Sequence, residues 1–321
     1  MIDEETTDMQ DATTTEMVES LSADEKERAA RTSYRYFVAS DCQSGDQPPN
    51  EQIRLRFAKR MARRHLEAEK GNSALALRKM RDTLHYREEM RVDVIRRCFY
   101  HVPEKRDDGH ASGGAEDGDG ALADPHSPYR ERLGNELTEG KIFVRGRGRA
   151  GHPLLCVLTH KYASGFSQDW YMKYNIYTLE RALAVAERES DGRLEKVIAA
   201  FDFGQYTNRF RPPLGLSKDI LFCLRDHYPE RIECIILVDT PVVFRAFWKL
   251  LRPFIDPNTK GKIRFVTGDD EKTAVVGDLV DPSCAMPFMI PGGKLESELD
   301  MERYLYGTPF DRTVEENLRG C

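Results

Sequence analysis

Three basic side chains repeat at helical spacing in the segment after Pro241, and apolar residues surround them. Arg245, Lys249 and Arg252 stand at i, i+4 and i+7, so a helix would place them on one narrow stripe. The rest of the circumference is apolar and holds Val242, Val243, Phe244, Phe247, Trp248, Leu250, Leu251 and Phe254. A wide apolar face beside a basic stripe is typical of a helix that lies on a membrane surface. A buried core helix has a similar composition, so the pattern alone leaves both interpretations open.

A glycine-rich run, GRGRAG at residues 146–151, satisfies the G-x-G-x-x-G pattern of dinucleotide-binding sites. In such sites the glycines let a pyrophosphate approach the N-terminus of a helix. Here the next residues, HPLLCVL, contain a proline and then a strand pattern instead of a helix. We therefore expect a hairpin turn between IFVR and LLCVL, and no dinucleotide cofactor.

Other motifs of catalysis, metal binding and nucleic-acid binding are incomplete. The sequence has neither the G-x-S-x-G nucleophile motif nor the P-loop pattern. The eight histidines show no metal-binding spacing, and the DGDG run at 117–120 lacks the ligand spacing of a calcium loop. The RGRGR run at 145–149 has no interleaved aromatic residues on which RNA bases could stack. We predict a protein that is not an enzyme and that has no cofactor, no metal ion and no nucleic-acid partner.

Acidic residues are concentrated at the N-terminus, where nine of the 54 precede the first basic residue, Lys26. The remaining 45 nearly balance the 48 Lys and Arg, so the body of the chain has no strong field for a polyanion. The seven cysteines are widely spaced without a CxxC pair, which is typical of a reducing compartment. No apolar stretch approaches the ~18 residues of a membrane span, and no signal-like segment opens the sequence. We expect a cytoplasmic protein that associates peripherally with membranes.

Composition divides the chain into five parts. The acidic, Thr-rich residues 1–27 have no sustained apolar period, which predicts a disordered tail. Residues 28–102 have a basic helical pattern, which predicts a small helical cap module. Residues 103–130 are rich in Gly, Asp, Ser and Pro, which predicts a flexible linker. A main domain over residues 131–310 and a C-terminal tail over residues 311–321 complete the chain.

Within the main domain, short apolar strands alternate with helical patterns. The expected strands are Leu154–Leu158, Val197–Phe203, Ile232–Asp239 and Ile263–Thr267. The expected helices are Met172–Glu189, Leu216–Tyr228 and Val242–Phe254. Nearly continuous apolar strands separated by helices predict an α/β fold with a mostly parallel sheet covered by helices.

Several segments together resemble the CRAL-TRIO lipid-binding family, and in particular its yeast-type phosphatidylinositol-transfer branch. YPER at 228–231, an apolar strand, Pro241 and FRAFWKLLRPFIDPNTKGKI at 244–263 are similar to the family's YPER, gate-helix and hinge segment, without a gap. GKIFVRGRGRAGHPLL is similar to the hairpin that opens the family's domain, and MPFMIPGGKLE to its closing motif. EAEKGN and HYREEM are similar to elements of the family's helical cap.

The resemblance implies a hydrophobic pocket between the sheet and a mobile gate helix, which holds one phospholipid and exchanges it between membranes. Phosphatidylinositol is the ligand that it implies, with phosphatidylcholine as another candidate. The implied headgroup-binding residues are Lys70, Glu230, Thr259 and Lys262. The implied gate-helix residues that contact the lipid chains are Val243, Phe244, Phe247, Trp248, Leu251 and Phe254. The implied hinge residues are Asp256, Pro257 and Gly261.

One position departs from the family pattern. EAEKGN aligns with the family's R-A-R-K-G-N, so Glu67 and Glu69 stand where arginines are expected. The second of these arginines normally helps to bind the phosphate, and a carboxylate there repels it. The candidates to replace the missing charge are Lys59, Arg60, Arg63 and Arg64.

Two other functions stay open beside phospholipid transfer. One is a lipid-regulated adaptor, in which the acidic tail or the linker binds a protein partner. The other is a carrier of a hydrophobic ligand without a phosphate, such as a retinoid, tocopherol or sterol, which Glu69 would favour. In each case we expect a monomer that makes transient contact with a membrane surface.

Overall fold

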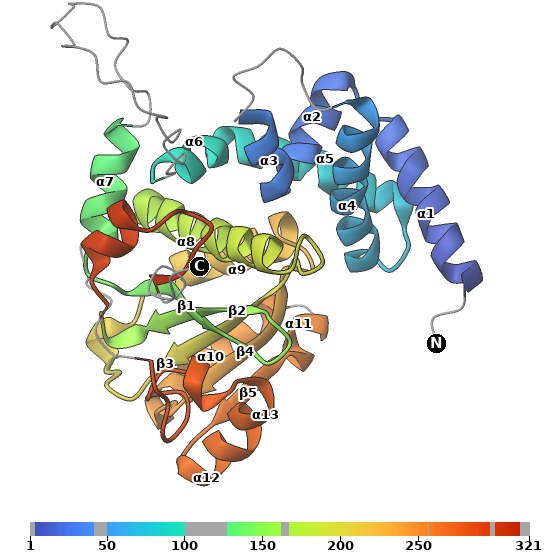
Figure 1. Ribbon diagram of the computed structural model, residues 1–321. Coiled ribbons are helices and arrows are strands. Elements are labelled where there is room, and N and C mark those ends of the chain that lie inside the picture. Colours follow the sequence, from blue (N-terminus) through green and yellow to red (C-terminus); the bar gives the residue numbers. More distant parts are fainter. Residues whose placement is uncertain are drawn as a thin grey trace, which may run out of the picture.

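A computed structural model of the protein describes residues 4–41, 50–99, 127–161, 167–255, 257–295 and 299–314. The chain forms a lobe built on one β-sheet, and its N-terminal helices gather at one end of that lobe (Figure 1). The fold is mixed α/β, as the alternation of strand and helix patterns predicts.

The sheet has five strands in the order β1-β2-β3-β4-β5. Their bounds are β1(Ile142–Arg147), β2(Pro153–Leu158), β3(Val197–Asp202), β4(Ile232–Val238) and β5(Ile263–Val266). β1 runs antiparallel to β2, and the other three pairings are parallel. The expected mostly parallel sheet is therefore confirmed. The hairpin expected at GRGRAG is also confirmed, because this run leads from β1 to β2 with Gly146 and Gly151 at positive φ.

The two faces of the sheet have different surroundings, because successive strand residues point to opposite sides. Leu154, Cys156 and Ile198 on one face are fully buried in the main core, together with Val276, Val280 and other residues that follow β5. On the other face, the pairing register aligns Leu155 with Ala199, Ala199 with Ile235, and Ile235 with Ile263. Leu155, Ile235 and Ile263 are only partly buried, and this row faces the site described below.

The lobe contains one long helix, several shorter helices and single helical turns. The α-helices are α7(Ser127–Leu137), α8(Gln168–Glu189), α9(Leu214–His227), α10(Val242–Leu251), α11(Pro257–Gly261), α12(Asp269–Glu271) and α13(Gly277–Leu279). The 3₁₀ and π turns are η1(Thr159–Lys161), η2(Asn208–Phe210), η3(Arg252–Phe254), η4(Lys272–Val276), η5(Pro282–Cys284) and η6(Arg303–Gly307). α8 is buried nearly all round because it packs against the strands on one side and against α3, α6 and α7 on the other.

The N-terminal helices have a small core of their own. They are α1(Glu4–Glu19), α2(Ala23–Arg31), α3(Tyr34–Asp41), α4(Glu51–Ala68), α5(Ser73–Glu89) and α6(Val92–Arg97). The side chains of Asn50 and Asn72 accept hydrogen bonds from the first-turn amides of α4 and α5, so the sequence sets where both helices begin. α3 and α6 lie along α8, and α5 contacts α9, which attaches this module to the lobe.

The disordered acidic tail expected over residues 1–27 is a wrong prediction for residues 4–27. α1 and most of α2 occupy this stretch, and Met17, Val18 and Leu21 are buried in the N-terminal core. Met17 and Val18 pack α1 against α4, and Leu21 joins the same core just after the helix. Tertiary packing, more than propensity, supplies most helical stability. The acidic residues around these three apolar residues hid this signal.

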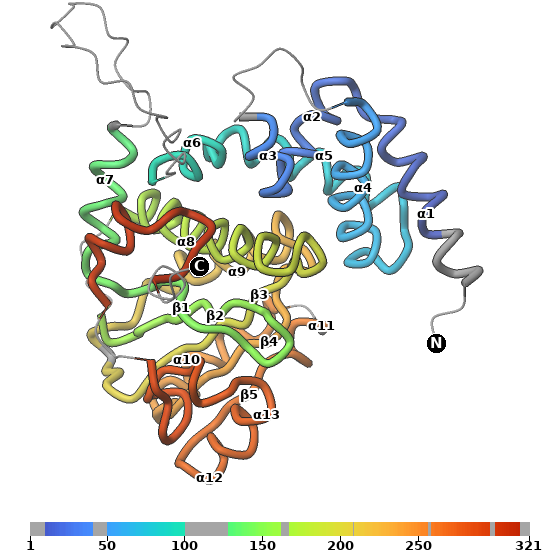
Figure 2. The backbone as a smooth tube through the Cα atoms, viewed as in Figure 1, coloured from blue at the N-terminus to red at the C-terminus, as the bar shows by residue number. Residues whose placement is uncertain are grey.

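The other two expected flexible segments are described only in part. Residues 100–126 of the expected linker lie outside the described residues, whereas 127–130 begin α7. Residues 315–321 of the expected tail also lie outside, but residues 311–314 are fixed to the lobe. Figure 2 shows the last described segment returning to α8. There the buried guanidinium of Arg181 donates to the carbonyls of Tyr304, Thr308, Pro309 and Arg312.

The described part of the chain contains no helix that is both long enough and apolar enough to cross a bilayer.

Candidate functional site

A cavity of about 490 Å³ lies between the partly buried face of the sheet and the helices α8, α9 and α10. The sheet contributes the row described above, in which Leu155, Ala199, Ile235 and Ile263 are paired, and the neighbouring row with Val157, Phe201 and Leu237. α8 contributes Tyr171, Met172, Asn175, Ile176 and Leu179. Most of the wall is apolar, which is typical of a pocket for a hydrophobic ligand.

One wall of the cavity is α10, the expected gate helix. Phe244, Phe247, Trp248 and Leu251 all line the cavity, as does Phe254 in the turn that follows. The ring of Phe244 lies 4.2 Å from that of Phe203, the residue that follows β3, measured between centroids. The ring of Trp248 lies 5.4 Å from that of Phe265. Five of the six expected gate residues therefore meet at one cavity.

Val243 is the exception among these gate residues. Its side chain does not line the cavity and is 38% exposed. The outer side of α10 also presents Val242, which is 80% exposed, and Leu250, which is 55% exposed. The basic residues Arg245 and Lys249 lie on the same exposed side. α10 thus has an aromatic face toward the cavity and a mixed apolar and basic face toward the exterior.

The expected hinge follows the gate helix. Pro257 and Gly261 are the first and last residues of α11, whereas Asp256 lies outside the described residues. A side chain added at Gly261 would meet no heavy atom within 4 Å, so this position has room around it. The carbonyl of Gly261 accepts a hydrogen bond from the guanidinium of Arg264 at 2.6 Å, so this contact is the one that a change of backbone conformation would have to break.

Each side chain of the YPER motif that can form a polar contact has a separate partner. The Tyr228 hydroxyl donates to Glu180 at 2.8 Å, and the Lys262 ammonium donates to Glu230 at 2.9 Å. Arg231 donates to the backbone carbonyl of Glu195 at 3.2 Å. The backbone of Glu230 has φ +54°, which turns the chain sharply between these two anchors. The motif fixes the carboxylate of Glu230 at the wall of the cavity.

The polar part of the cavity wall brings together three of the four expected headgroup residues. Glu230, Thr259 and Lys262 all line the cavity. Lys70 does not, because it occupies an exposed turn between α4 and α5. Two further residues line the wall, Glu69 and Lys79, whose side chains form an ion pair. No local pattern predicts the role of Lys79, because its position depends on how α5 packs against α9.

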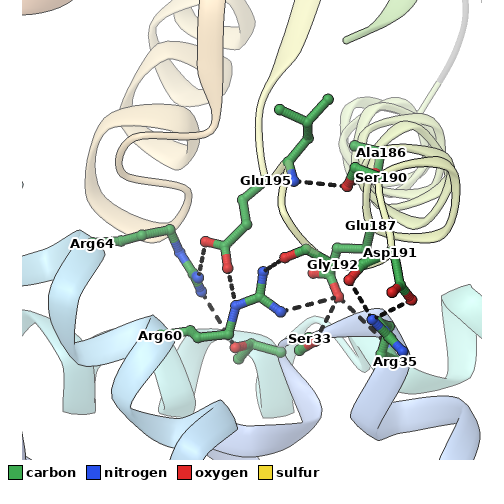
Figure 3. Close-up of polar contacts among 12 residues, drawn as sticks. Ser33, Arg35, Arg60, Arg64, Ala186, Glu187, Ser190, Asp191, Gly192 and Glu195 are labelled. Carbon is green, nitrogen blue, oxygen red and sulfur yellow. Dashed lines mark hydrogen bonds and ion pairs between the residues drawn. The ribbon is translucent and has the colours of Figure 1, made fainter. Parts of the chain in front are cut away.

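The expected replacements for the missing arginine lie elsewhere. None of Lys59, Arg60, Arg63 and Arg64 lines the cavity. Arg60 and Arg64 instead form ion pairs with Glu195 of the lobe (Figure 3). The charge lost at Glu69 is therefore balanced by Lys79 in the cavity wall and not by α4.

Lys141 is another cavity residue that the sequence did not reveal. It is 2% exposed, lies 3.4 Å from the carboxylate of Glu139, and has its ammonium 5.9 Å from the ring centre of Tyr171. Burial lowers the pKa of Lys141, and the carboxylate of Glu139 opposes that effect. This residue places a further basic group on the wall, beside the apolar strands.

The one cysteine among the described residues that line the cavity, Cys223, is not an activated nucleophile. Burial raises the pKa of the cavity-lining Cys223 to about 11, so its thiol stays protonated at neutral pH. The described residues also include no cluster of His, Cys, Asp and Glu that could hold a metal ion. The arrangement is suited to holding an apolar molecule with a polar end.

Comparisons with known proteins agree with this geometry. Residues 137–285 match the CRAL/TRIO domain. "Phosphatidylinositol transfer protein PDR17" of Saccharomyces cerevisiae is 27% identical over 230 residues, which cover 69% of this chain and 56% of that protein. "Phosphatidylinositol transfer protein CSR1" of Eremothecium gossypii is 25% identical over 51% of this chain and 36% of that protein. The chain thus spans about half or less of the length of these relatives.

A solved structure with a similar fold is titled "Crystal structure of Sfh5". It superposes with a TM-score of 0.53 and 14% sequence identity, over 82% of this chain and 84% of that one. At this identity the similarity concerns the fold alone.

Proposed function

Residues 137–285 form a CRAL/TRIO domain, and on that premise we propose that this protein binds a single phospholipid in the cavity under α10 and exchanges it between membranes. The observation that carries the proposal is one cavity with two kinds of wall. Aromatic and aliphatic side chains make up most of it, and an ion pair between Glu230 and Lys262 lies at its polar part. A phospholipid has the same division between apolar chains and a charged headgroup.

Transfer through such a cavity avoids the main free-energy cost of moving a lipid. Exposing acyl chains to water costs ~0.8 kcal/mol for each CH₂ group. Acyl chains that pass from the bilayer to Phe244, Phe247 and the sheet face remain in apolar surroundings. Movement of the gate then replaces extraction into water as the step that limits exchange.

The size of the cavity supports an opening movement. A volume of about 490 Å³ falls within the ~300–1,000 Å³ of pockets that enclose one drug-sized molecule. A diacyl phospholipid has two acyl chains besides its headgroup, so it is larger than such a molecule and needs a larger space. We propose that α10 swings outward about the α11 segment, with Pro257 and Gly261 as hinge residues, when the ligand enters. Asp256 belongs to the same proposed hinge.

The outer face of α10 has the composition needed to meet a membrane. Val242 and Leu250 are exposed apolar residues, and Arg245, Lys249 and Arg252 are exposed basic residues on the same helix and the turn after it. Insertion of the apolar side chains and attraction of the basic ones to anionic lipid act together. We therefore propose that the protein associates peripherally with membranes through α10. The proposal also includes a cytoplasmic protein that acts as a monomer and does no chemistry on its lipid.

We propose phosphatidylinositol as the ligand, with its phosphate at Lys262 and Thr259. The ammonium of Lys262 supplies charge, the Thr259 hydroxyl can donate to a phosphate oxygen, and Glu230 can accept from an inositol hydroxyl. Lys79 adds a second cation in the cavity wall. Phosphatidylcholine is the other phospholipid that this site could accept, because Glu69 and Glu230 can face its positive choline group.

Glu69 favours a second candidate, a hydrophobic ligand without a phosphate. This carboxylate lines the cavity at a position where the family has a phosphate-binding arginine, and its ion pair consumes the charge of Lys79. A retinoid, tocopherol or sterol needs no cation. The two candidates differ in whether binding depends on Lys262.

Mass spectrometry of bound lipid tests both candidates. The wild-type protein and Lys262→Ala are incubated with mixed liposomes, re-isolated, and extracted. We expect phosphatidylinositol on the wild-type protein and a loss of about tenfold on Lys262→Ala, which corresponds to ~1.4 kcal/mol. A matched control is Lys70→Ala, which removes a lysine outside the cavity and should retain most of the lipid.

Vesicle-to-vesicle transfer of the identified lipid completes the test. Transfer that is fast for the wild-type protein and slow for Lys262→Ala supports a transfer protein. A neutral lipid held equally by both proteins would instead support the second candidate. Binding without transfer would refute the transfer proposal and favour a lipid sensor.

A further inference from the structure

A second cavity lies outside the CRAL/TRIO domain's ligand pocket, in the N-terminal module. It is a groove of about 1,090 Å³ between α1, α4 and the turn that follows α8. α1 contributes Asp11, Thr14, Thr15, Val18 and Glu19 to its walls. α4 contributes Gln52, Ile53, Leu55, Arg56, Phe57, Lys59, Arg60 and Arg63. The remaining lining residues are Arg35, Asp191, Gly192 and Arg193. Lipid binding and transfer make no use of this groove.

Basic residues outnumber acidic ones in the groove. Its lining includes six cations, Arg35, Arg56, Lys59, Arg60, Arg63 and Arg193, against three carboxylates, Asp11, Glu19 and Asp191. The sequence as a whole has the opposite balance, with a formal net charge of −6. The groove therefore concentrates positive charge on an acidic protein, which attracts anionic groups locally.

Part of this charge holds the module to the lobe, as Figure 3 shows. Arg35 forms an ion pair with Asp191 at 2.9 Å, and Arg60 pairs with Glu195 and contacts Glu187. Lys59 lies 3.8 Å from the carboxylate of Asp11 across the groove. These three cations already have partners.

The other three arginines carry charge that the fold does not use. Arg56, Arg63 and Arg193 are all exposed, and no carboxylate of the described residues pairs with any of them. Arg56 and Arg63 are seven residues apart on α4, so they share one face at a separation of about 10 Å along the helix. The Nε of Arg193 donates to the Ser190 carbonyl at 2.9 Å, which fixes its stem on the opposite wall.

The same groove has an apolar surface that water reaches. Ile53 is 42% exposed and is one of the few large apolar side chains of the described residues with that exposure. Leu55 and Phe57 are partly buried beside it, and both pack against the N-terminal core. An occupant can therefore gain both charge-assisted hydrogen bonds and apolar burial.

We propose that this groove binds a short acidic peptide segment of a partner protein. Its carboxylates would accept bidentate hydrogen bonds from Arg56, Arg63 and Arg193, and one large apolar side chain would pack on Ile53 and Phe57. The groove follows α4 from Gln52 to Arg63, which is about 16 Å at 1.5 Å per residue. An extended segment of about five residues at ~3.3 Å each fills that length.

The form of the groove favours a peptide over other anions. Asp11, Glu19 and Asp191 in its walls repel a compact polyphosphate, whereas a peptide can place its carboxylates only opposite the arginines. A bilayer surface cannot follow a concave groove between two helices. α10, which carries the exposed Val242 and Leu250, lies at another part of the molecule than α1 and α4 (Figure 1), so gate and groove serve different contacts.

The proposal can be tested by selecting displayed random hexapeptides on the full-length protein. We expect enrichment of peptides with several Asp or Glu residues and one large apolar residue. Fluorescein-labelled copies of the selected peptides are then titrated by anisotropy. Arg56→Glu combined with Arg63→Glu should weaken binding at least tenfold, because two favourable charge contacts become repulsive.

A charge-matched control is the double variant Arg78→Glu and Lys294→Glu, which changes two exposed cations outside the groove. It should bind the peptides as the wild-type protein does, and both variants should keep the wild-type unfolding curve and lipid loading. Selection without acidic enrichment, or equal weakening in both variants, would overturn the proposal. The proposal would also be overturned if no peptide is selected and the groove variant instead loses binding to phosphatidylserine vesicles or to inositol hexakisphosphate.

Discussion

The lobe carries two attached elements, and the forces that hold them differ. α10 packs on the sheet through aromatic contacts among Phe203, Phe244 and Trp248. The N-terminal module is attached beside α8 through buried ion pairs, in which Arg60 and Arg64 meet Glu195 (Figure 3). One contact surface is apolar and the other is ionic.

The ionic contact extends along α8 and into the segment that follows it. Glu187 accepts from the hydroxyl of Ser33 and the amide of Arg35, and Glu195 also lies 3.8 Å from Arg231 of the YPER motif. A comparable cluster joins α5 and α6 to α8, where Arg87 and Arg96 pair with the fully buried Glu180. The same Glu180 accepts from Tyr228, so both clusters include a YPER residue.

This difference separates a moving element from a fixed one. Hydrophobic contacts are not directional, so acyl chains can replace the contacts that α10 makes with the sheet. A buried ion pair is directional, and removal of one partner leaves the other as an uncompensated charge. We expect α10 to move during lipid exchange while the N-terminal module stays in place.

The largest effect that we predict is that of Glu195→Gln, which tests whether the ionic contact holds the N-terminal module. The change leaves Arg64, which is 7% exposed at its side chain, without its counter-ion. Breaking a buried pair in this way costs about 3–5 kcal/mol. We expect that loss in the free energy of unfolding, measured by urea denaturation followed by circular dichroism.

The matched control for this change is Glu233→Gln. The carboxylate of Glu233 is 43% exposed and lies 3.7 Å from Lys196, so its loss should cost less than about 1 kcal/mol. Similar stabilities of the two variants would show that the ionic surface does not hold the module.

Acid should weaken the ionic surface in a defined pH range. Burial by itself raises the pKa of Glu195, but the surrounding guanidinium groups outweigh burial and lower it to about 2. A lowered pKa stabilises the fold fully above the ordinary value near 4.5, and this contribution is lost as the pH falls toward 2. The difference corresponds to about 3 kcal/mol at 1.36 kcal/mol per pH unit.

Urea denaturation at a series of pH values checks this effect. The wild-type protein should lose stability from about pH 4.5 downward, and Glu195→Gln should lose about 3 kcal/mol less over the same range. Parallel curves for the two proteins would contradict the assignment of the acid effect to Glu195.

The substitution Phe247→Asp tests whether the apolar face of α10 holds the lipid. Phe247 is 6% exposed and lines the cavity, so the charged side chain would face the space where we place acyl chains. We expect loss of lipid loading by more than tenfold, measured by mass spectrometry of bound lipid. The free energy of unfolding should fall by about 3 kcal/mol, at the low end of the range for truncation of a buried Phe, because this side chain already borders a cavity. Normal loading would refute the role of α10 as the gate.

Its control is Phe143→Leu, a change in the main core away from the cavity. Phe143 is 1% exposed and does not line the cavity, so this variant should lose stability without losing lipid. Equal loss of loading in both variants would mean that loading follows stability and not the gate.

The same division explains which features the sequence could predict. Strands, helices and the gate segment follow from local periodicity, and the parallel order β2, β3, β4, β5 follows from their alternation with helices. The cavity-lining residues between Tyr228 and Lys262, such as Glu230, Phe247 and Thr259, come from one continuous motif. Local pattern was therefore sufficient for most of the apolar surface.

Ionic partners depend on contacts between distant segments, which no local pattern reveals. Arg64 and Glu195 are 131 residues apart in the sequence, and Lys79 meets Asp226 only because α5 packs on α9. The prediction of a disordered N-terminus failed for a related reason, since Met17 and Val18 gain their burial from α4. Lys70 is a matched motif position that lies outside the cavity, so its expected headgroup role stays a prediction.

The smallest effect that we predict concerns the outer face of α10. Leu250→Ser removes an apolar side chain that is 55% exposed, so the free energy of unfolding should change by less than about 0.5 kcal/mol. Partial insertion of this side chain into a bilayer should contribute about 1 kcal/mol, so its loss lowers binding to anionic vesicles about fivefold. Vesicle sedimentation measures the effect, with Ile53→Ser as a control at an exposed apolar site on α4. Because Ile53 belongs to the peptide groove and not to the gate, equal losses in both variants would show that α10 is not the element that meets the membrane.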